Sequence, residues 1–193
     1  MHPPDKELVK KAKRKDKNAF TLLVDRYSDR IFSYLYRYVG DYQKAEDLTI
    51  ETFLNAYTRI RTYREMGKFS AWLYMIATNC AKKELQKRKR LKEVSIDRPF
   101  IANESITLKD LISDERSRPD YNARQAEFKE FIYKIIANLD KKYKDVLLLC
   151  DVEGLSYREV ARALRCNVIT VGTRIRRART LLYKSLKRYG YKF

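Results

Sequence analysis

Residues 155–182 read LSYREVARALRCNVITVGTRIRRARTLL, and this stretch decides the fold of the second half of the chain. Ser156 followed by Glu159 is a capping-box pattern, which starts a helix by satisfying two free backbone N–H groups. The helical period then breaks over residues 165–167, where a turn is needed. The stretch therefore predicts two helices joined by a tight turn.

The second predicted helix has an apolar face and a basic face. Its cap is either Asn167 or Thr170. Apolar residues recur at the i, i+4, i+7, i+11 spacing of one helical face, namely Val171, Ile175, Ala178 and Leu182. The opposite face carries Thr173, Arg176, Arg177 and Thr180, with Arg174 and Arg179 on its flanks. Hydrogen-bonding side chains are thus expected to point outward.

Such a pair of helices is typical of a helix-turn-helix, which presents its second helix to the major groove of DNA. Arginine side chains there bind guanine edges or phosphates. A surface helix with a solvated basic face is the alternative. The cap, the turn and the absence of acidic residues after Glu159 together favour the DNA-binding interpretation.

The net charge of +18 and the isoelectric point near 9.8 indicate a polyanionic partner, for which nucleic acid is the obvious candidate. No apolar run approaches the roughly 20 residues that span a bilayer. The amino terminus also lacks the apolar segment of a signal peptide, so we expect a cytoplasmic protein. The three cysteines are widely spaced and accompany a single histidine, His2, which argues against a disulfide framework or a metal site. We expect core positions for Cys80, Cys150 and Cys166.

The four prolines are Pro3, Pro4, Pro99 and Pro119. They leave two long proline-free spans, and both spans have helical periodicity. The expected fold is all-α, with two small helical domains over residues 1–93 and 121–193, the second containing the helix-turn-helix. Residues 94–120 lose the periodicity and carry more carboxylates than basic groups, so we expect a flexible, acidic linker.

In the first domain, Gly40 is expected to end one helix and Asp41 to cap the next. One face of that next helix shows Glu46, Asp47 and Glu51. In a basic protein this acidic face is either ordinary solvated surface or a docking surface for a basic partner.

A helix that begins at Phe69 aligns aromatic, amide and basic side chains on one face, namely Trp72, Met75, Asn79, Lys82, Lys83 and Gln86. Aromatic rings stack on unpaired bases, and basic groups follow the phosphate backbone, so this face suits a single strand. The alternative is that Trp72 fills the core while the lysines are solvated. The basic run at residues 87–90 extends the same helix.

Three segments together resemble a bacterial sigma factor of the extracytoplasmic-function group. Residues 45–53 (AEDLTIETF) look like the polymerase-binding helix of domain two of that family, and residues 69–79 (FSAWLYMIATN) are similar to its promoter-melting helix. Residues 154–161 (GLSYREVA), with the residues that follow up to 179, are similar to its domain four. The resemblance covers nearly the whole chain apart from the linker.

The resemblance implies that the protein binds core RNA polymerase and promoter DNA and needs no cofactor, no metal and no enzymatic activity. It implies −35 duplex recognition by Arg158, Thr170, Thr173, Arg174, Arg176 and Arg177. It implies −10 strand melting and binding by Arg64, Phe69, Trp72, Asn79 and Lys83. It implies polymerase binding by Glu46, Asp47, Glu51 and Phe53. Members of the family are commonly held inactive by an anti-sigma protein, often membrane-anchored, which we list as an expected partner.

Three residues depart from the family pattern. Ile50 replaces a polar residue on the polymerase-facing helix, Arg165 replaces a turn glycine, and Gly172 replaces a frequent basic residue. Two other classes of function stay open. A helix-turn-helix repressor or activator would act without polymerase, and a nucleic-acid enzyme would need a catalytic cluster, a phosphate-binding glycine loop or a Cys-His metal spacing, none of which the sequence shows.

Overall fold

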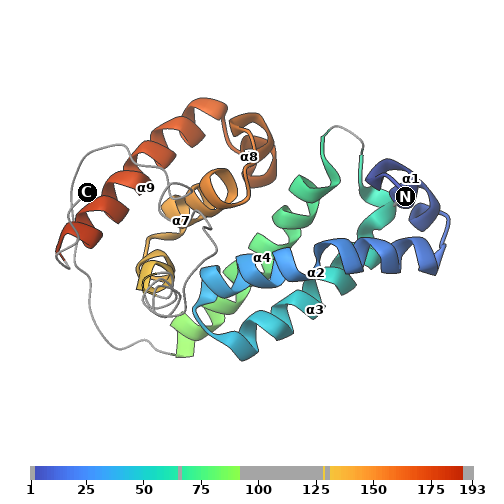
Figure 1. Cartoon of the computed structure of the whole chain (residues 1–193), viewed down its shortest axis with the longest axis horizontal. Helices are drawn as coiled ribbons and strands as arrows, with labels where there is room; N and C mark the ends of the chain where they lie inside the picture. The colour runs from blue at the N-terminus through green and yellow to red at the C-terminus, as the bar shows by residue number, and fades with distance from the viewer. Residues whose placement is uncertain (1–2, 65–66, 92–127, 129–130, 189–193) are drawn as a thin grey trace, which may run out of the picture. The chain divides into compact units, whose positions relative to one another are not determined.

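The computed structural model describes residues 3–64, 67–91, 128 and 131–188, and it confirms the all-α prediction, since no strand occurs in these ranges. The chain divides into two compact units, Met1–Leu91 and Lys92–Phe193, and each is described by itself (Figure 1). The predicted linker over residues 94–120 lies outside the described residues. None of the described helices combines the length and the apolar character that a membrane span requires.

The first unit is built from long helices that pack side by side. They are α1 (Asp5–Lys13), α2 (Lys17–Val39), α3 (Tyr42–Arg59), the 3-10 turn η1 (Ile60–Thr62) and α4 (Phe69–Leu91). The cap residues act locally: the Asp41 carboxylate accepts a hydrogen bond from the Lys44 backbone N–H at 3.0 Å, and Gly40 ends α2 with φ of 68°. Both predictions at this helix boundary are confirmed.

Tyrosines as well as aliphatic residues fill the centre of the first unit. Tyr34, Tyr38 and Tyr74 are among its largest fully buried side chains. The Thr78 hydroxyl donates to the Tyr74 carbonyl oxygen at 2.7 Å and therefore accepts from the Tyr34 hydroxyl at 2.6 Å. A buried hydroxyl without a partner would cost about 1–3 kcal/mol, so this pairing lets α2 and α4 pack closely.

The second unit contains the predicted helix-turn-helix. Helical residues 131–137 are followed by α7 (Lys141–Leu147), the π-helix η2 (Leu148–Val152), α8 (Tyr157–Leu164) and α9 (Val168–Arg188). Both halves of the capping box form, because the Ser156 side chain accepts from the Glu159 N–H while the Glu159 carboxylate accepts from the Ser156 N–H. Asn167 caps α9 by accepting from the Ile169 N–H at 2.9 Å.

Two details of the expected burial pattern in this unit are wrong. Thr180 is only 5% exposed and does not lie on the outward face, because α9 packs against both α7 and α8 and buries a wider arc than one stripe. Cys150 lies in the π-helix, which adds a residue to one turn after the buried residues 144–149, and it is only half-buried, as is Cys166 in the turn before α9. Of the cysteines, Cys80 alone is fully in the core.

Lys144 is buried in the second unit, a placement that the apolar spacing did not predict. Its Nζ donates a hydrogen bond to the Ala137 carbonyl oxygen, near the end of the helix over residues 131–137. Burial lowers its pKa from 10.5 to about 8, while the neighbouring Asp145 carboxylate partly offsets this effect. Because removing a charge from water is costly, this lysine weakens the unit while it is protonated.

Lys144→Met should therefore change the pH dependence of stability. Below pH 8 the lysine is protonated in both the folded and the unfolded state, so the wild type bears the full cost. Between about pH 8 and 10.5 the unfolded state binds more protons, and the wild type gains stability that the variant does not gain.

Denaturation monitored by circular dichroism at pH 7, 8.5 and 10 should show the stability difference, variant minus wild type, falling as the pH rises. Trp72, the single tryptophan, lies in the first unit, so its fluorescence transition is the internal control. A pH-independent difference would show that Lys144 does not titrate in this range.

Candidate nucleic-acid interface

The turn between α8 and α9 is tight because Arg165 adopts a left-handed conformation, with φ of 52° and ψ of 49°. The Cys166 N–H closes the turn by donating to the Ala161 carbonyl oxygen at 2.9 Å. A side chain in this conformation costs roughly 1 kcal/mol relative to glycine, so Arg165 places a small strain in the turn. The turn nevertheless forms, so the departure from glycine does not disrupt the motif.

The predicted −35 residues lie on this one module. Thr173, Arg176 and Arg177 are exposed on α9, and Arg158 is exposed on α8. Arg174 and Thr170 are half-buried at the edge of the same helix. Outward guanidinium groups on a helix of this kind suit guanine edges and phosphates.

A hollow of about 840 Å³ adjoins these residues, between the end of α8 and the start of α9, and it includes two arginines that the predicted set did not contain. It is lined by Arg158, Ala161, Arg162, Arg165, Cys166, Asn167 and Val168. The first helix of a helix-turn-helix crosses the DNA backbone, so guanidinium groups here are suited to phosphates. Arg162 and Arg165 therefore extend the candidate contact set.

Arg179 has a different role from the other arginines of α9. Its Nη2 and Nε bind the two carboxylate oxygens of Asp151 at 2.6 and 2.9 Å. The Asp151 side chain is nearly fully buried, and the pair joins α9 to the π-helix. A two-point Arg–carboxylate contact sets an orientation as well as a distance, so this pair orients the recognition helix.

The predicted −10 residues fall into two groups along α4. The first group is an aromatic cluster at the start of the helix, where the Trp72 ring lies 5.3 Å from the Tyr63 ring and 5.6 Å from the Phe69 ring. Phe69 is buried, with a further edge contact to Tyr27 at 5.8 Å, so its ring supports Trp72 and has no open stacking face. Trp72 is half-buried and Arg64 is exposed beside the cluster.

The second group lines a hollow of about 410 Å³ between α3 and α4, which combines amides with basic groups. Its residues are Asn55, Arg59, Ile76, Asn79, Cys80, Lys82, Lys83 and Gln86. Asn79 lies ten residues beyond Phe69, which is ~15 Å along the helix. One strand must therefore extend along α4 to reach both groups.

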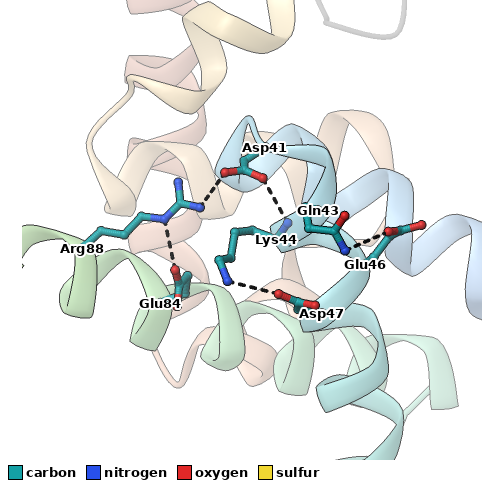
Figure 2. Close-up of polar contacts among 7 residues, drawn as sticks. All are labelled: Asp41, Gln43, Lys44, Glu46, Asp47, Glu84 and Arg88. Carbon is teal, nitrogen blue, oxygen red and sulfur yellow. Dashed lines mark hydrogen bonds and ion pairs between the residues drawn. The ribbon is translucent and has the colours of Figure 1, made fainter.

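The acidic face of α3 is partly neutralised by neighbouring side chains (Figure 2). The Lys44 Nζ lies 3.1 Å from an Asp47 carboxylate oxygen, and the Gln43 amide donates to Glu46 at 3.3 Å. Glu51 is exposed. The side chains of Asp47 and Lys44 are about half exposed, so a partner can compete for this pair.

An apolar strip accompanies these carboxylates on α3. Ile50 and Leu54 are 63% and 62% exposed, and Tyr57 continues the strip one turn later. Phe53, by contrast, is buried and belongs to the core, although it lies next to this strip on the helix. The exposed apolar surface of α3 is therefore formed by Ile50, Leu54 and Tyr57, and not by Phe53, which was predicted to bind polymerase.

Arg88 of α4 ties the start of α3 to the end of the candidate strand-binding helix (Figure 2). Its Nη2 lies 2.9 Å from an Asp41 carboxylate oxygen, and its Nε donates to Glu84 at 3.0 Å. The Lys44 backbone N–H and then the Arg88 guanidinium lower the pKa of Asp41. One residue of the basic run therefore has a structural contact within the unit.

Comparison with known proteins matches each unit to a family. Residues 23–91 match Sigma-70 region 2, and residues 131–182 match Sigma-70, region 4. The RNA polymerase sigma-H factor of Pseudomonas aeruginosa is 35% identical over 95% of this chain and 94% of its own length. The ECF RNA polymerase sigma factor SigW of Bacillus subtilis is 34% identical over 94% of this chain and 96% of its own length.

The chain belongs to the extracytoplasmic-function group of sigma factors. Solved structures agree with the fold. The structure of CnrH in complex with the cytosolic domain of CnrY has a TM-score of 0.68 at 21% identity and covers 95% of this chain and 97% of that chain. The sigma factor RpoE from Bartonella quintana, solved in complex with the anti-sigma factor NepR, has a TM-score of 0.63 at 22% identity and covers 87% of this chain and 96% of that chain.

In this sigma factor, the region 2 match contains the acidic face, the apolar strip, the aromatic cluster and the amide-lined hollow. The region 4 match contains the whole turn and the outward arginines of α9. Leu54 and Tyr57 were not predicted as part of this surface, although their spacing from Ile50 is helical. The role of Arg179 has no local sequence signal, because its partner Asp151 lies 28 residues away.

Arg179→Met should destabilise the second unit by about 2–4 kcal/mol, because it leaves the buried Asp151 carboxylate without its cation. Arg176→Met is the matched control on the exposed face of the same helix, and we expect a change within about 0.5 kcal/mol. Chemical denaturation followed by circular dichroism measures both, and Trp72 fluorescence should be unchanged in both. Equal stability of the two variants would show that the ion pair does not hold α9.

Proposed function

We propose that this protein is an alternative sigma factor that binds core RNA polymerase and directs it to specific promoters. The observation that carries the proposal is the presence, in one chain, of three distinct surfaces: a helix-turn-helix with outward arginines, a helix with an aromatic cluster and basic hollow, and an acidic and apolar helix face. Its relatives are named RNA polymerase sigma factors, and this supports the assignment.

Domain four, predicted over residues 121–193, would read the −35 element as duplex through Thr173, Arg176 and Arg177. Domain two, predicted over residues 1–93, would melt and hold the −10 element. There Trp72 would stack on an unpaired base, while Asn79 and Lys83 would bind a base edge and the backbone. The acidic linker over residues 94–120 would join the two. Phe69 supports Trp72 in this assignment and does not itself contact a base.

Polymerase binding would use the face of α3. Glu46, Asp47 and Glu51 supply negative charge for a basic partner, while Ile50 and Leu54 supply apolar area that such a partner would bury. Phe53 contributes by holding α3 in the core. The exposed Ile50 gives this face a more apolar centre than a polar residue would.

Strand opening in this scheme needs no cofactor and no hydrolysis. Stacking of a base on an aromatic side chain is worth about 1–3 kcal/mol, which offsets part of the cost of unpairing. We therefore class the protein as a transcription initiation factor and not as an enzyme, acting in the cytoplasm where promoter DNA and polymerase meet. A repressor acting without polymerase would leave the α3 face and the aromatic cluster without a use.

An anti-sigma protein is the regulator that we expect for this chain. The sigma factor RpoE from Bartonella quintana was solved in complex with such a protein, which supports the expectation through family and fold. The exposed strip at Ile50 and Leu54 is the surface that an inhibitor of polymerase binding would cover. A membrane anchor, where present, would belong to that partner.

Asp47→Lys should weaken binding to core RNA polymerase, because it reverses a charge on the proposed docking face and repels the neighbouring Lys44. We expect a loss of at least tenfold in affinity, measured by competition with a labelled sigma factor. Asp29→Lys makes the same charge change on an exposed position of α2 and should bind as the wild type does. Equal affinity of both variants, with helix content retained, would remove α3 as the docking face.

Arg176→Ala and Trp72→Ala should fail in different assays. The first should weaken holoenzyme binding to the upstream duplex by roughly 1–3 kcal/mol. The second should leave that binding intact and slow strand opening, measured by permanganate reactivity of unpaired thymines. Lys187→Ala, exposed near the far end of α9, is the control for loss of one positive charge. Equal defects of the first two variants in both assays would contradict the division between the units.

A further inference from the structure

The start of α9 exposes apolar surface at the end of the recognition helix that enters the major groove. Ile169 is 77% exposed, the largest value among the exposed large hydrophobic side chains in the described part of the chain. Its neighbour Val168 is also exposed. Scattered exposed hydrophobic residues are ordinary on a protein surface. The position matters here, because the N-terminal residues of a recognition helix contact base edges.

Gly172 lies one turn after Ile169 on the same face and leaves that place without a side chain. A Cβ at this position would meet only the Cε2 of Tyr157, at 3.9 Å. Thr173 directs its hydroxyl back along the helix, donating to the Ile169 carbonyl oxygen at 3.1 Å. We call the apolar surface made by Ile169, the bare backbone of Gly172 and the partly exposed Tyr157 ring the notch. Arg176 follows Gly172 one turn later.

We propose that this notch takes the C5 methyl group of a thymine in the upstream promoter duplex, and that Ile169 is a specificity-determining residue. The proposal rests on the proposed function, since it specifies what the duplex-reading surface prefers. The thymine methyl is the apolar group that base edges present in the major groove. A glycine one turn after Ile169 lets the helix backbone approach the groove more closely than a side chain would permit.

Arg176 and Ile169 then supply two different kinds of readout on one helix face. The guanidinium recognises hydrogen-bond acceptors, whereas the notch recognises the absence of a polar group and the presence of a methyl. The preferred upstream element should therefore contain a thymine one helical turn of α9 away from the base that Arg176 contacts.

The test replaces thymidine by deoxyuridine, which removes only the C5 methyl and keeps every hydrogen-bonding group. The upstream element is first found by transcription with the reconstituted holoenzyme, and each thymine of either strand is then replaced in turn. At one position, deoxyuridine should weaken wild-type holoenzyme binding by roughly threefold to fivefold at fixed salt, the effect of burying one methyl group. Ile169→Ala should bind the two duplexes equally.

Gly172→Ala is a second test of the notch, and this variant is not expected to destabilise the fold. Alanine is the better helix former and its Cβ meets no close atom, so the unfolding midpoint of the full chain should rise. The added methyl fills the notch, and discrimination between thymine and uracil should disappear. Lys187→Ala, on the same helix but distant from the notch, should discriminate as the wild type does.

Two results would contradict the proposed contact between the notch and a thymine methyl group. In the first, wild-type holoenzyme does not distinguish deoxyuridine from thymidine at any position, or its upstream element contains no thymine. In the second, Ile169→Ala discriminates as well as the wild type, which would assign the methyl contact to another residue. Failure of the proposed function looks different, because the protein would then not associate with core polymerase or start transcription. In that case, the same deoxyuridine series is measured on a duplex selected by the protein alone. It shows whether Ile169 contacts a thymine methyl group.

Discussion

Each of the two helices proposed to face DNA has one arginine that pairs with a carboxylate of its own unit. In the second unit, Arg179 binds the buried Asp151 carboxylate through two nitrogen atoms and so fixes the rotation of α9 about its axis. In the first unit, Arg88 joins α4 to the cap of α3 through Asp41. In each pair, one positive charge of a basic helix is neutralised by a carboxylate of the same unit. The remaining charges on the helix are then presented in a defined direction.

This arrangement explains how a chain of high net charge remains folded. Apart from Lys144, the basic residues of the described part of the chain are at least partly exposed, on helices whose buried faces are mainly apolar or carry hydrogen-bonded tyrosines. The cationic surfaces repel one another in isolation, and binding of DNA removes that repulsion. Duplex recognition and strand capture then require different chemistry, guanidinium groups in one unit and an aromatic cluster in the other.

Local signals were sufficient to predict the helix boundaries. Ser156 with Glu159, Gly40 and Asp41 each act through backbone groups a few residues away, so their effect is visible in sequence. The break in the helical period over residues 165–167 predicted a turn there, and the structure adds that Arg165 is left-handed. Much of the candidate site was predicted for the same reason, because outward residues of a helix share a spacing.

Tertiary packing decided the rest. The arginines of α9 look alike in sequence, and only the position of Asp151 sets Arg179 apart. Thr180 is buried because a second helix packs on α9, and the π-helix shifts the residues after Leu147 by part of a turn. Phe53 and Phe69 belong to the core, since the helix faces that carry them turn toward other aromatic and apolar groups. None of these contacts is local along the chain.

Reconstitution with bacterial core RNA polymerase that lacks any other sigma factor tests the central claim most directly. The readout is stable association followed by transcription from a library of genomic fragments. The account predicts a complex with new start sites that share two spaced upstream elements. Absence of a complex, together with tight sequence-specific duplex binding by the protein alone, would contradict it.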